Sequence, residues 1–228
     1  KTIGLSFGGM GVTFDFSVVD VTPEVRASIG TSGRMALTGA ILVNADSGGS
    51  ATASVHSPSG GAIAASGSSA RANMSPTTSA QIGAGTILDV DGTVSVLAHA
   101  TNPAVAKAES DAFGALTAVG LTKAEALANG STTATLAGSV AASSAITVRA
   151  TGDNTAQATA DAPSGGIGGT VNGGESIATA NGSVSAYLGD STVASSLHST
   201  GTIAVEALSD GDAYARTKGL SFGAGAVG

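Results

Sequence analysis

The sequence is poor in the residues that most often carry chemistry or fill a compact core. It contains no cysteine and no tryptophan, and only 3% of its residues are aromatic and 11% charged. Without cysteine the chain can form neither a disulfide nor a thiolate metal site. Its net charge of -7 comes from scattered acidic residues, so there is no basic surface for nucleic acid or anionic lipid. These absences exclude cysteine chemistry and disfavour nucleic-acid binding.

Long hydrophobic runs are also missing. No run approaches the roughly 18 apolar residues that a membrane-spanning helix needs, so we expect no membrane insertion. The first residues, Lys1 to Gly4, do not have the charged and apolar regions of a signal peptide. We therefore expect a mature chain or a segment of a longer one.

Small residues dominate what is present. Glycine accounts for 34 of the 228 residues, and the chain mass is only 21.4 kDa. Leu, Ile, Val and Phe together make up roughly a fifth of the chain, which is near the composition at which disorder begins. Two alternatives remain: a disordered Gly/Ala/Ser chain, or a repetitive fold whose layers are thin enough for Ala and Val to fill. Regular hydrophobic alternation favours the repetitive fold.

A seven-residue strand pattern recurs four times and organises the chain. Alternate positions hold a β-branched aliphatic residue, a valine and an alanine, while the positions between them vary freely. Because the side chains of a strand alternate between two faces, this pattern predicts one buried face and one solvent-exposed face. The four copies are Gly39–Ala45, Gly92–Ala98, Ser144–Ala150 and Gly201–Ala207.

The copies follow one another at a nearly constant period. The spacings between their central residues are 53, 52 and 57, measured between Ile41, Val94, Ile146 and Ile203. A short apolar step precedes every copy, and an Ala-x-Ala motif follows it. Such a period is typical of a solenoid. We predict that residues 1–228 form a single all-β segment, a parallel right-handed β-solenoid (β-helix) built from four superrepeats of about 53 residues.

Clusters of Gly, Asp, Asn and Pro between the alternating runs predict turns. They divide each superrepeat into about six short strands, so the simplest geometry is two three-sided coils of about 27 residues, with three coils of about 18 as the alternative. About eight coils at about 4.8 Å would form a rod about 40 Å long. Leu121–Leu127 has some helical propensity, but we predict a strand there. The expected turns are Asp46–Gly49, Asn102–Pro103, Gly152–Asn154, Asn172–Gly174 and Asp210–Asp212.

The C-terminal repeats resemble a known class of repeat. The run Ala186–Val193, followed by Gly201–Ala207, Ala213–Ala215 and Gly219–Gly228, is similar to the shaft repeats of large secreted bacterial adhesins, the filamentous-haemagglutinin-like and leukotoxin-like proteins. Residues 1–30 resemble the other half of the same unit. The resemblance covers essentially the whole chain. It implies a parallel β-solenoid shaft at the bacterial cell surface or in the medium, and its motifs bring no catalytic residues with them.

Candidate chemical groups do not form a recognisable site. The histidines, His56, His99 and His198, occupy different phases of the repeat, so we expect neither a metal site nor a catalytic site from them. Asp89–Gly92 and Asp210–Asp212 contain closely spaced carboxylates like fragments of calcium loops, but the further ligands are missing. Serine and threonine are abundant, yet no base stands at a recognisable spacing from any of them.

Two surface patterns have simpler explanations. Thr132–Thr135 suggests an ice-binding threonine array, but Leu97, Arg149 and Glu206 interrupt the outward positions of the organising strands. Three glycosylation sequons begin at Asn73, Asn129 and Asn181, and two of these are Asn-Gly pairs typical of turns. The sequence therefore assigns no catalytic, cofactor-binding or metal-binding residue.

We expect a non-enzymatic structural segment of an extracellular fibrous surface protein, which gives reach and a repetitive surface. Its expected partners are adjoining repeats, joined end to end, with cell surfaces or glycans as further candidates. We expect no cofactor. An alternative is a protomer of a head-to-tail filament, because Gly4–Gly8 and Gly219–Gly223 share sequence and phase. A third alternative, a polysaccharide-acting β-helix enzyme, rests on fold analogy alone.

Overall fold

The computed structural model describes residues 2–3, 6–30, 32–189 and 195–227. Within these residues the chain consists of strands and connections, with no helix. Every pairing between its strands is parallel. The all-β prediction is thus confirmed, and the parallel sheets are compatible with a β-helix.

The strands vary widely in length. They are β1 (Thr2–Ile3), β2 (Ser6–Val21), β3 (Glu24–Ile29), β4 (Gly33–Leu37), β5 (Ile41–Gly48), β6 (Ala51–Met74), β7 (Thr77–Ile82), β8 (Thr86–Val90), β9 (Thr93–Ala128), β10 (Ser131–Leu136), β11 (Ser139–Ala142), β12 (Ala145–Gly166), β13 (Gly169–Ala180), β14 (Ser183–Leu188), β15 (Ile203–Phe222) and β16 (Gly225–Val227). The longest ones form a single sheet. Two smaller sheets have the orders β14-β10-β7-β3 and β11-β8-β4.

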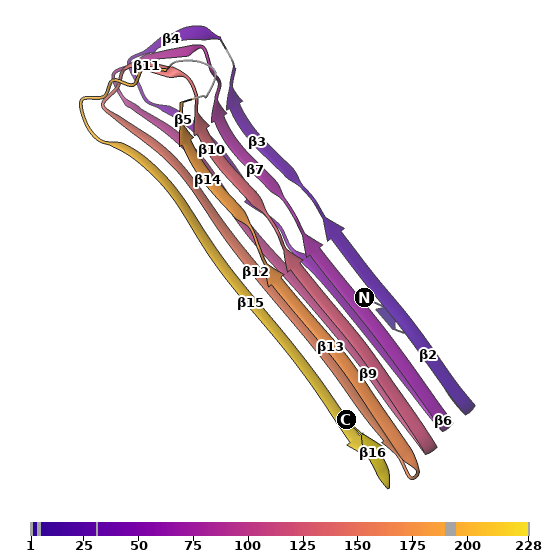
Figure 1. Cartoon of the computed structure of the whole chain (residues 1–228). Coiled ribbons are helices and arrows are strands. Elements are labelled where there is room, and N and C mark those ends of the chain that lie inside the picture. Colours follow the sequence, from indigo (N-terminus) through magenta and orange to yellow (C-terminus); the bar gives the residue numbers. More distant parts are fainter. Residues whose placement is uncertain (1, 4–5, 31, 190–194, 228) are drawn as a thin grey trace.

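The long strands run along one axis and then return. Figure 1 shows β12 passing into β13 through a tight turn at the far end of the molecule, after which the chain runs back. Within β6 the two arms face each other, because Ala51–Val55 and Ala70–Met74 contribute to the same buried cluster. This part of the interior therefore lies between the outgoing and the returning arms of the long strands, and alanine side chains line most of it.

The organising strands pair with one another at the spacing seen in the sequence. Ile41 pairs with Val94, Val94 with Ile146, and Ile146 with Ile203. The predicted coil lengths of about 27 or 18 residues are therefore wrong. Five strands lie side by side in the order β1-β6-β9-β12-β15. At about 4.8 Å per strand the stack is about 20 Å thick, half the predicted rod length, because fewer and wider layers accommodate the same chain.

The predicted inward ladder is present. The first three organising strands bury their Ile or Val, Val and Ala positions in one cluster, together with Ile82, Leu88 and Leu136 from the smaller sheets. In the last copy, Ile203 and Val205 are 45% and 43% exposed, because β15 lies at the end of the stack. The repeating apolar face thus supplies the core wherever another layer covers it.

Four of the five predicted turns are wrong, since they lie inside continuous strands. These are Asn102–Pro103 in β9, Gly152–Asn154 in β12, Asn172–Gly174 in β13 and Asp210–Asp212 in β15. Side-chain contacts explain why such residues occur in strands. A Cβ on Gly152 would lie 2.7 Å from Val184 Cγ2, so this glycine provides space rather than a turn. Buried Asn102 donates a hydrogen bond from Nδ2 to Asn154 Oδ1 at 2.9 Å.

The segment Leu121–Leu127 forms part of β9, as predicted. It pairs with β6 on one side and with β13 on the other, and Ala124 and Ala126 are buried. Pairing on both sides and burial of the alanines outweigh the local helical propensity. In the part of the chain that the structure describes, no helix is long and apolar enough to cross a membrane.

Candidate functional site: inter-layer contacts and open strand edges

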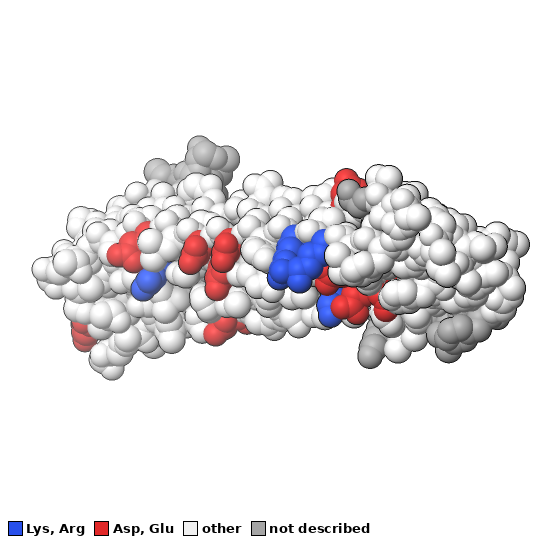
Figure 2. Space-filling view, turned by 90° about the horizontal axis from the view of Figure 1, so that it is seen from below, with Lys and Arg blue, Asp and Glu red and all other residues white. Residues whose placement is uncertain are grey.

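Ion pairs connect neighbouring layers on the outer faces. Three pairs that involve Lys or Arg join residues at paired register positions: Arg71 with Glu125 (3.8 Å), Lys123 with Glu175 (3.0 Å) and Arg149 with Glu206 (3.5 Å). Figure 2 shows that charged side chains on one face form small separate groups in a mainly uncharged surface. Because the pairs are solvent-exposed, each adds little stability, and they mainly favour one register over another.

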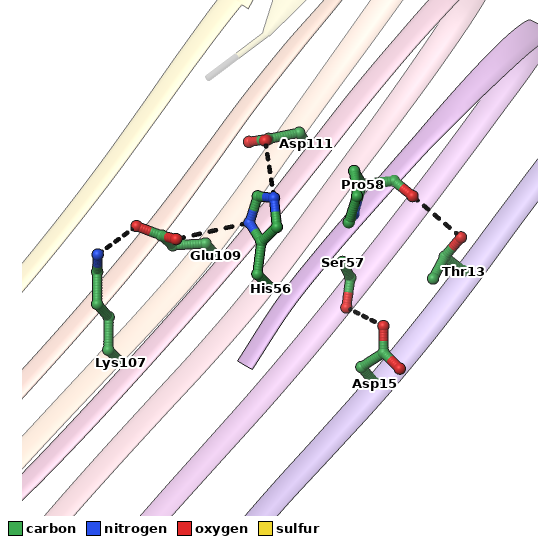
Figure 3. A network of polar contacts seen from close by, with 8 residues as sticks. All are labelled: Thr13, Asp15, His56, Ser57, Pro58, Lys107, Glu109 and Asp111. Carbon is green, nitrogen blue, oxygen red and sulfur yellow. Dashed lines mark hydrogen bonds and ion pairs between the residues drawn. The ribbon is translucent and has the colours of Figure 1, made fainter. Parts of the chain in front are cut away.

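The most extensive polar network surrounds His56 (Figure 3). His56, in β6, lies between two carboxylates of β9: its Nδ1 is 3.5 Å from Glu109 Oε2, and its Nε2 is 3.6 Å from Asp111 Oδ2. Lys107 Nζ lies 2.6 Å from the second carboxylate oxygen of Glu109. These residues alternate along their strands, so all of them project outward from the same sheet. The network joins two neighbouring layers.

Burial and charge shift two pKa values in this network. Burial raises the pKa of Asp111 above its usual 3.8, with the Glu109 charge adding to the rise and His56 opposing it. For Lys107, the hydrogen bond to Glu109 raises the pKa, and the charges of Glu109 and Asp161 add to this rise against the opposing effect of burial. The arrangement joins two layers through charged and polar groups, and it provides no nucleophile.

The other predicted candidates remain apart from this network. His99 Nε2 lies 3.5 Å from Thr101 Oγ1, and the backbone N–H of His198 donates to the Val140 carbonyl. Asp89 accepts a hydrogen bond from Arg34 Nη2 at 2.7 Å, while Asp210 and Asp212 lie exposed on β15. Among the residues that the structure describes, no group of three or more His, Asp or Glu side chains could hold a metal ion.

The threonine and sequon patterns have structural roles. Thr132 is buried, and Thr135 pairs with Gln81 and Tyr187, so β10 and its neighbours carry no regular threonine array. Asn129 lies between β9 and β10, and Asn181 lies between β13 and β14. These two asparagines therefore occupy connections, as expected.

A surface cavity that sequence reasoning did not anticipate lies near the end of β8. Its volume is about 420 Å³, and it is lined by residues that include Asp91, Ser143, His198 and Thr200. The Ser143 hydroxyl donates to the backbone carbonyl of His198 at 3.1 Å. The Ser143 hydroxyl is therefore bonded to the main chain of His198 and not to its imidazole ring.

Open strand edges lie at both ends of the stack. β15 pairs with β12 along one edge, and no described residue pairs with its other edge. At the opposite end, β2 directs alternate apolar side chains outward. These are Met10, Val12, Phe14, Phe16 and Val18, which are between 49% and 71% exposed. An exposed strand edge is a template for pairing with more chain.

Large side chains alternate with glycine across the layers. Phe113 pairs with Gly165, whose Cβ would lie 3.1 Å from the Phe113 ring. Likewise, a Cβ on Gly173 would lie 2.9 Å from Leu121 Cδ2, and Phe14 covers Gly67. Each bulky side chain thus covers a glycine of the following layer. This alternation of bulky residues with glycine can be recognised in the sequence only after the pairing between strands is known.

Comparison of the chain with protein-family models, with curated protein sequences and with solved structures finds no match.

Proposed function

We propose that the chain is a non-enzymatic structural segment of an extracellular fibrous surface protein, a shaft that provides reach and a repetitive surface. The observation that supports this best is the in-register pairing of each segment with the one a whole superrepeat later. In such a stack, each layer contacts only its neighbours. The shaft can therefore be lengthened by adding further layers in the same register.

The proposed architecture is a closed right-handed β-solenoid of four superrepeats, with one coil of about 53 residues per superrepeat. Two features support closure. The facing arms of β6 share a buried cluster, and the smaller sheets contribute Ile82, Leu88 and Leu136 to the cluster of the organising strands. The arms of the long strands thus enclose one buried cluster, and the organising strands with the short sheets enclose another.

The open edge of β15 is the proposed joining surface for an adjoining repeat. Along one ladder Phe7 pairs with Gly60, Gly60 with Phe113, Phe113 with Gly165, and Gly165 with Phe222. The alternation requires glycine opposite Phe222 in the next coil. An adjoining repeat that carries glycine at this position would continue the alternation.

A protomer of a self-assembling head-to-tail filament is the second candidate. The exposed apolar face of β2 favours it, because association of copies would remove this face from water. Gly4 and Leu5, part of the shared sequence that suggested this candidate, lie outside the described residues. The polysaccharide-acting enzyme remains an analogy of fold.

Limited proteolysis and electron microscopy test the proposed shaft. The purified chain should resist protease and appear as discrete particles, and each added coil should thicken the particle by about 4.8 Å. Rapid cleavage throughout the chain would contradict a folded shaft, and filaments that lengthen with concentration would support the head-to-tail alternative. Protease treatment of intact cells that produce the parent protein would test its proposed extracellular or cell-surface location, since an exposed shaft should be degraded.

A further inference from the structure

The buried side chains between the two arms of the long strands become more polar towards the far turn. Near the organising strands the interior is lined by Ala, Val and Ile, but towards the far turn it contains hydroxyl groups. Several of these hydroxyls are almost fully buried and have no hydrogen-bond partner among the described residues: Ser59, Ser66, Ser68, Ser110, Thr122, Ser164 and Thr170.

Such groups are unusual in a folded protein. A hydroxyl that loses its bond to bulk water on burial destabilises the fold unless another partner replaces that water. Most buried side-chain polar atoms therefore bond to protein or to ordered water. Here the hydroxyls occur in successive layers and not at a single place.

Several polar atoms converge on Gly120. It is buried, and it pairs with Ser66 in one neighbouring layer and with Asn172 in the other. A Cβ built on Gly120 would lie 3.4 Å from Asn172 Oδ1, 3.4 Å from Ser110 Oγ and 3.6 Å from the Pro163 carbonyl oxygen. Three polar atoms from three segments thus surround the space that a methyl group would occupy.

The polar side chains around this space lack other partners. Neither Ser110 Oγ nor the amide nitrogen and oxygen of Asn172 makes a hydrogen bond with another described residue. Ser110 is 0% exposed. A buried water typically makes two to four hydrogen bonds, and this arrangement offers three.

We propose that the space beside Gly120 binds one water molecule. The water accepts a hydrogen bond from the Ser110 hydroxyl and donates to Asn172 Oδ1 and to the Pro163 carbonyl. All three surrounding groups are uncharged, which suits water better than a hard cation with its larger set of oxygen ligands. Gly120 is then required for the room it leaves. This site is independent of the proposed shaft function.

The substitution Gly120→Ala distinguishes a hydrated site from a dry one. Gly120 does not have a positive φ, and an alanine Cβ would make contacts of 3.4 Å or more, so the side chain fits where the water would lie. If water is bound, its displacement leaves Ser110 and Asn172 unpaired, and Tm should fall. If the site is dry, Tm should rise, because alanine restricts the unfolded chain and fills the space.

Two further variants keep the experiment decisive. Gly48→Ala, in β5, meets no atom within 4 Å and reports the effect of glycine replacement alone. Ser110→Ala removes one partner of the water without adding volume. It should lower Tm if the site is hydrated, and raise it if the hydroxyl is simply buried without a partner.

A direct count of bound water completes the test. Oxygen-17 relaxation dispersion should show one long-lived water fewer in Gly120→Ala than in the wild-type protein, and a crystal structure of the wild type should show density between Ser110, Asn172 and Pro163. An unchanged water count together with a raised Tm would overturn the proposal. If Gly120→Ala does not fold, Ser110→Ala and the wild-type density decide the question.

Discussion

At the residue scale, many glycines of this protein are important because they have no side chain. Gly85 and Gly189 have the positive φ values of 77° and 85° that favour glycine in turns. Others lie where an adjacent layer approaches closely. A Cβ on Gly92 would lie 2.6 Å from the carbonyl oxygen of Gly39 in the preceding layer. Backbone proximity, more than turn geometry, therefore explains such positions.

Gly92→Ala should destabilise the protein by about 1–3 kcal/mol, because the new methyl group meets backbone atoms that cannot rotate away. Gly39→Ala is the matched control. Gly39 occupies the same phase one layer earlier, and a Cβ there meets no atom within 4 Å. Chemical denaturation of both variants provides the measurement. Equal effects of the two substitutions would contradict the close inter-layer contact at Gly92.

Asp111→Asn should make stability less dependent on pH. Because burial raises the pKa of Asp111 above 3.8, the folded state holds this proton to higher pH than the unfolded state does. The resulting stabilisation is complete below pH 3.8 and is lost as the pH rises through the raised pKa. The variant should therefore be slightly more stable than wild type at neutral pH, and this advantage should shrink on acidification. Thermal melts across the acid range would show it, and a difference that stays constant with pH would contradict it.

At the scale of elements, the repeated apolar face was predictable and the strand lengths were not. The alternation of Ile or Val, Val and Ala determines which side of each organising strand is buried, and the structure buries that side. Asn102 and Asn154 instead suggested turns, because asparagine is common in them. Their side chains form a hydrogen bond between adjacent layers, a contact that depends on a register invisible in local sequence.

Val12→Lys should reduce self-association of the chain. Val12 is 49% exposed on the outer face of β2, and a charge on an exposed edge strand opposes pairing with another chain. Gln157→Lys, on β12, places the same charge on a strand that has a neighbour on each side. Sedimentation velocity over a range of concentrations compares the two. If the two variants associate to the same extent, β2 is not the associating edge.

At the scale of the whole molecule, the period of the repeat could be predicted from sequence, but the number of layers per period could not. Turn residues suggested two or three short coils in each superrepeat. The pairing of Ile41 with Val94 shows one wide layer instead. The buried hydroxyls beside Gly120 were equally hidden, because serine at an inward position looks the same in sequence as serine on a surface strand.

Deleting residues 93–144 should give a folded protein that is one layer thinner. Ala145 pairs with Thr93, so the deletion joins Gly92 to the residue that occupies the same phase in the next layer. Because each layer contacts only its neighbours, cooperative unfolding should persist, with a denaturant m-value lower by roughly a quarter. Deleting residues 93–118 removes half a layer and should abolish cooperative unfolding. Cooperative folding of both deletions, or of neither, would contradict a 52-residue layer here.

Because bulky side chains alternate with glycine from layer to layer, neighbouring layers of the stack differ. Phe14 covers Gly67 and Leu121 covers Gly173, so equivalent rows return only after two layers. Duplicating a single layer in the gene would place two bulky rows or two glycine rows side by side. Duplicating two layers would preserve the sequence of rows. The smallest unit by which such a gene can grow without a packing defect is therefore a pair of superrepeats, twice the period that the strand pattern displays.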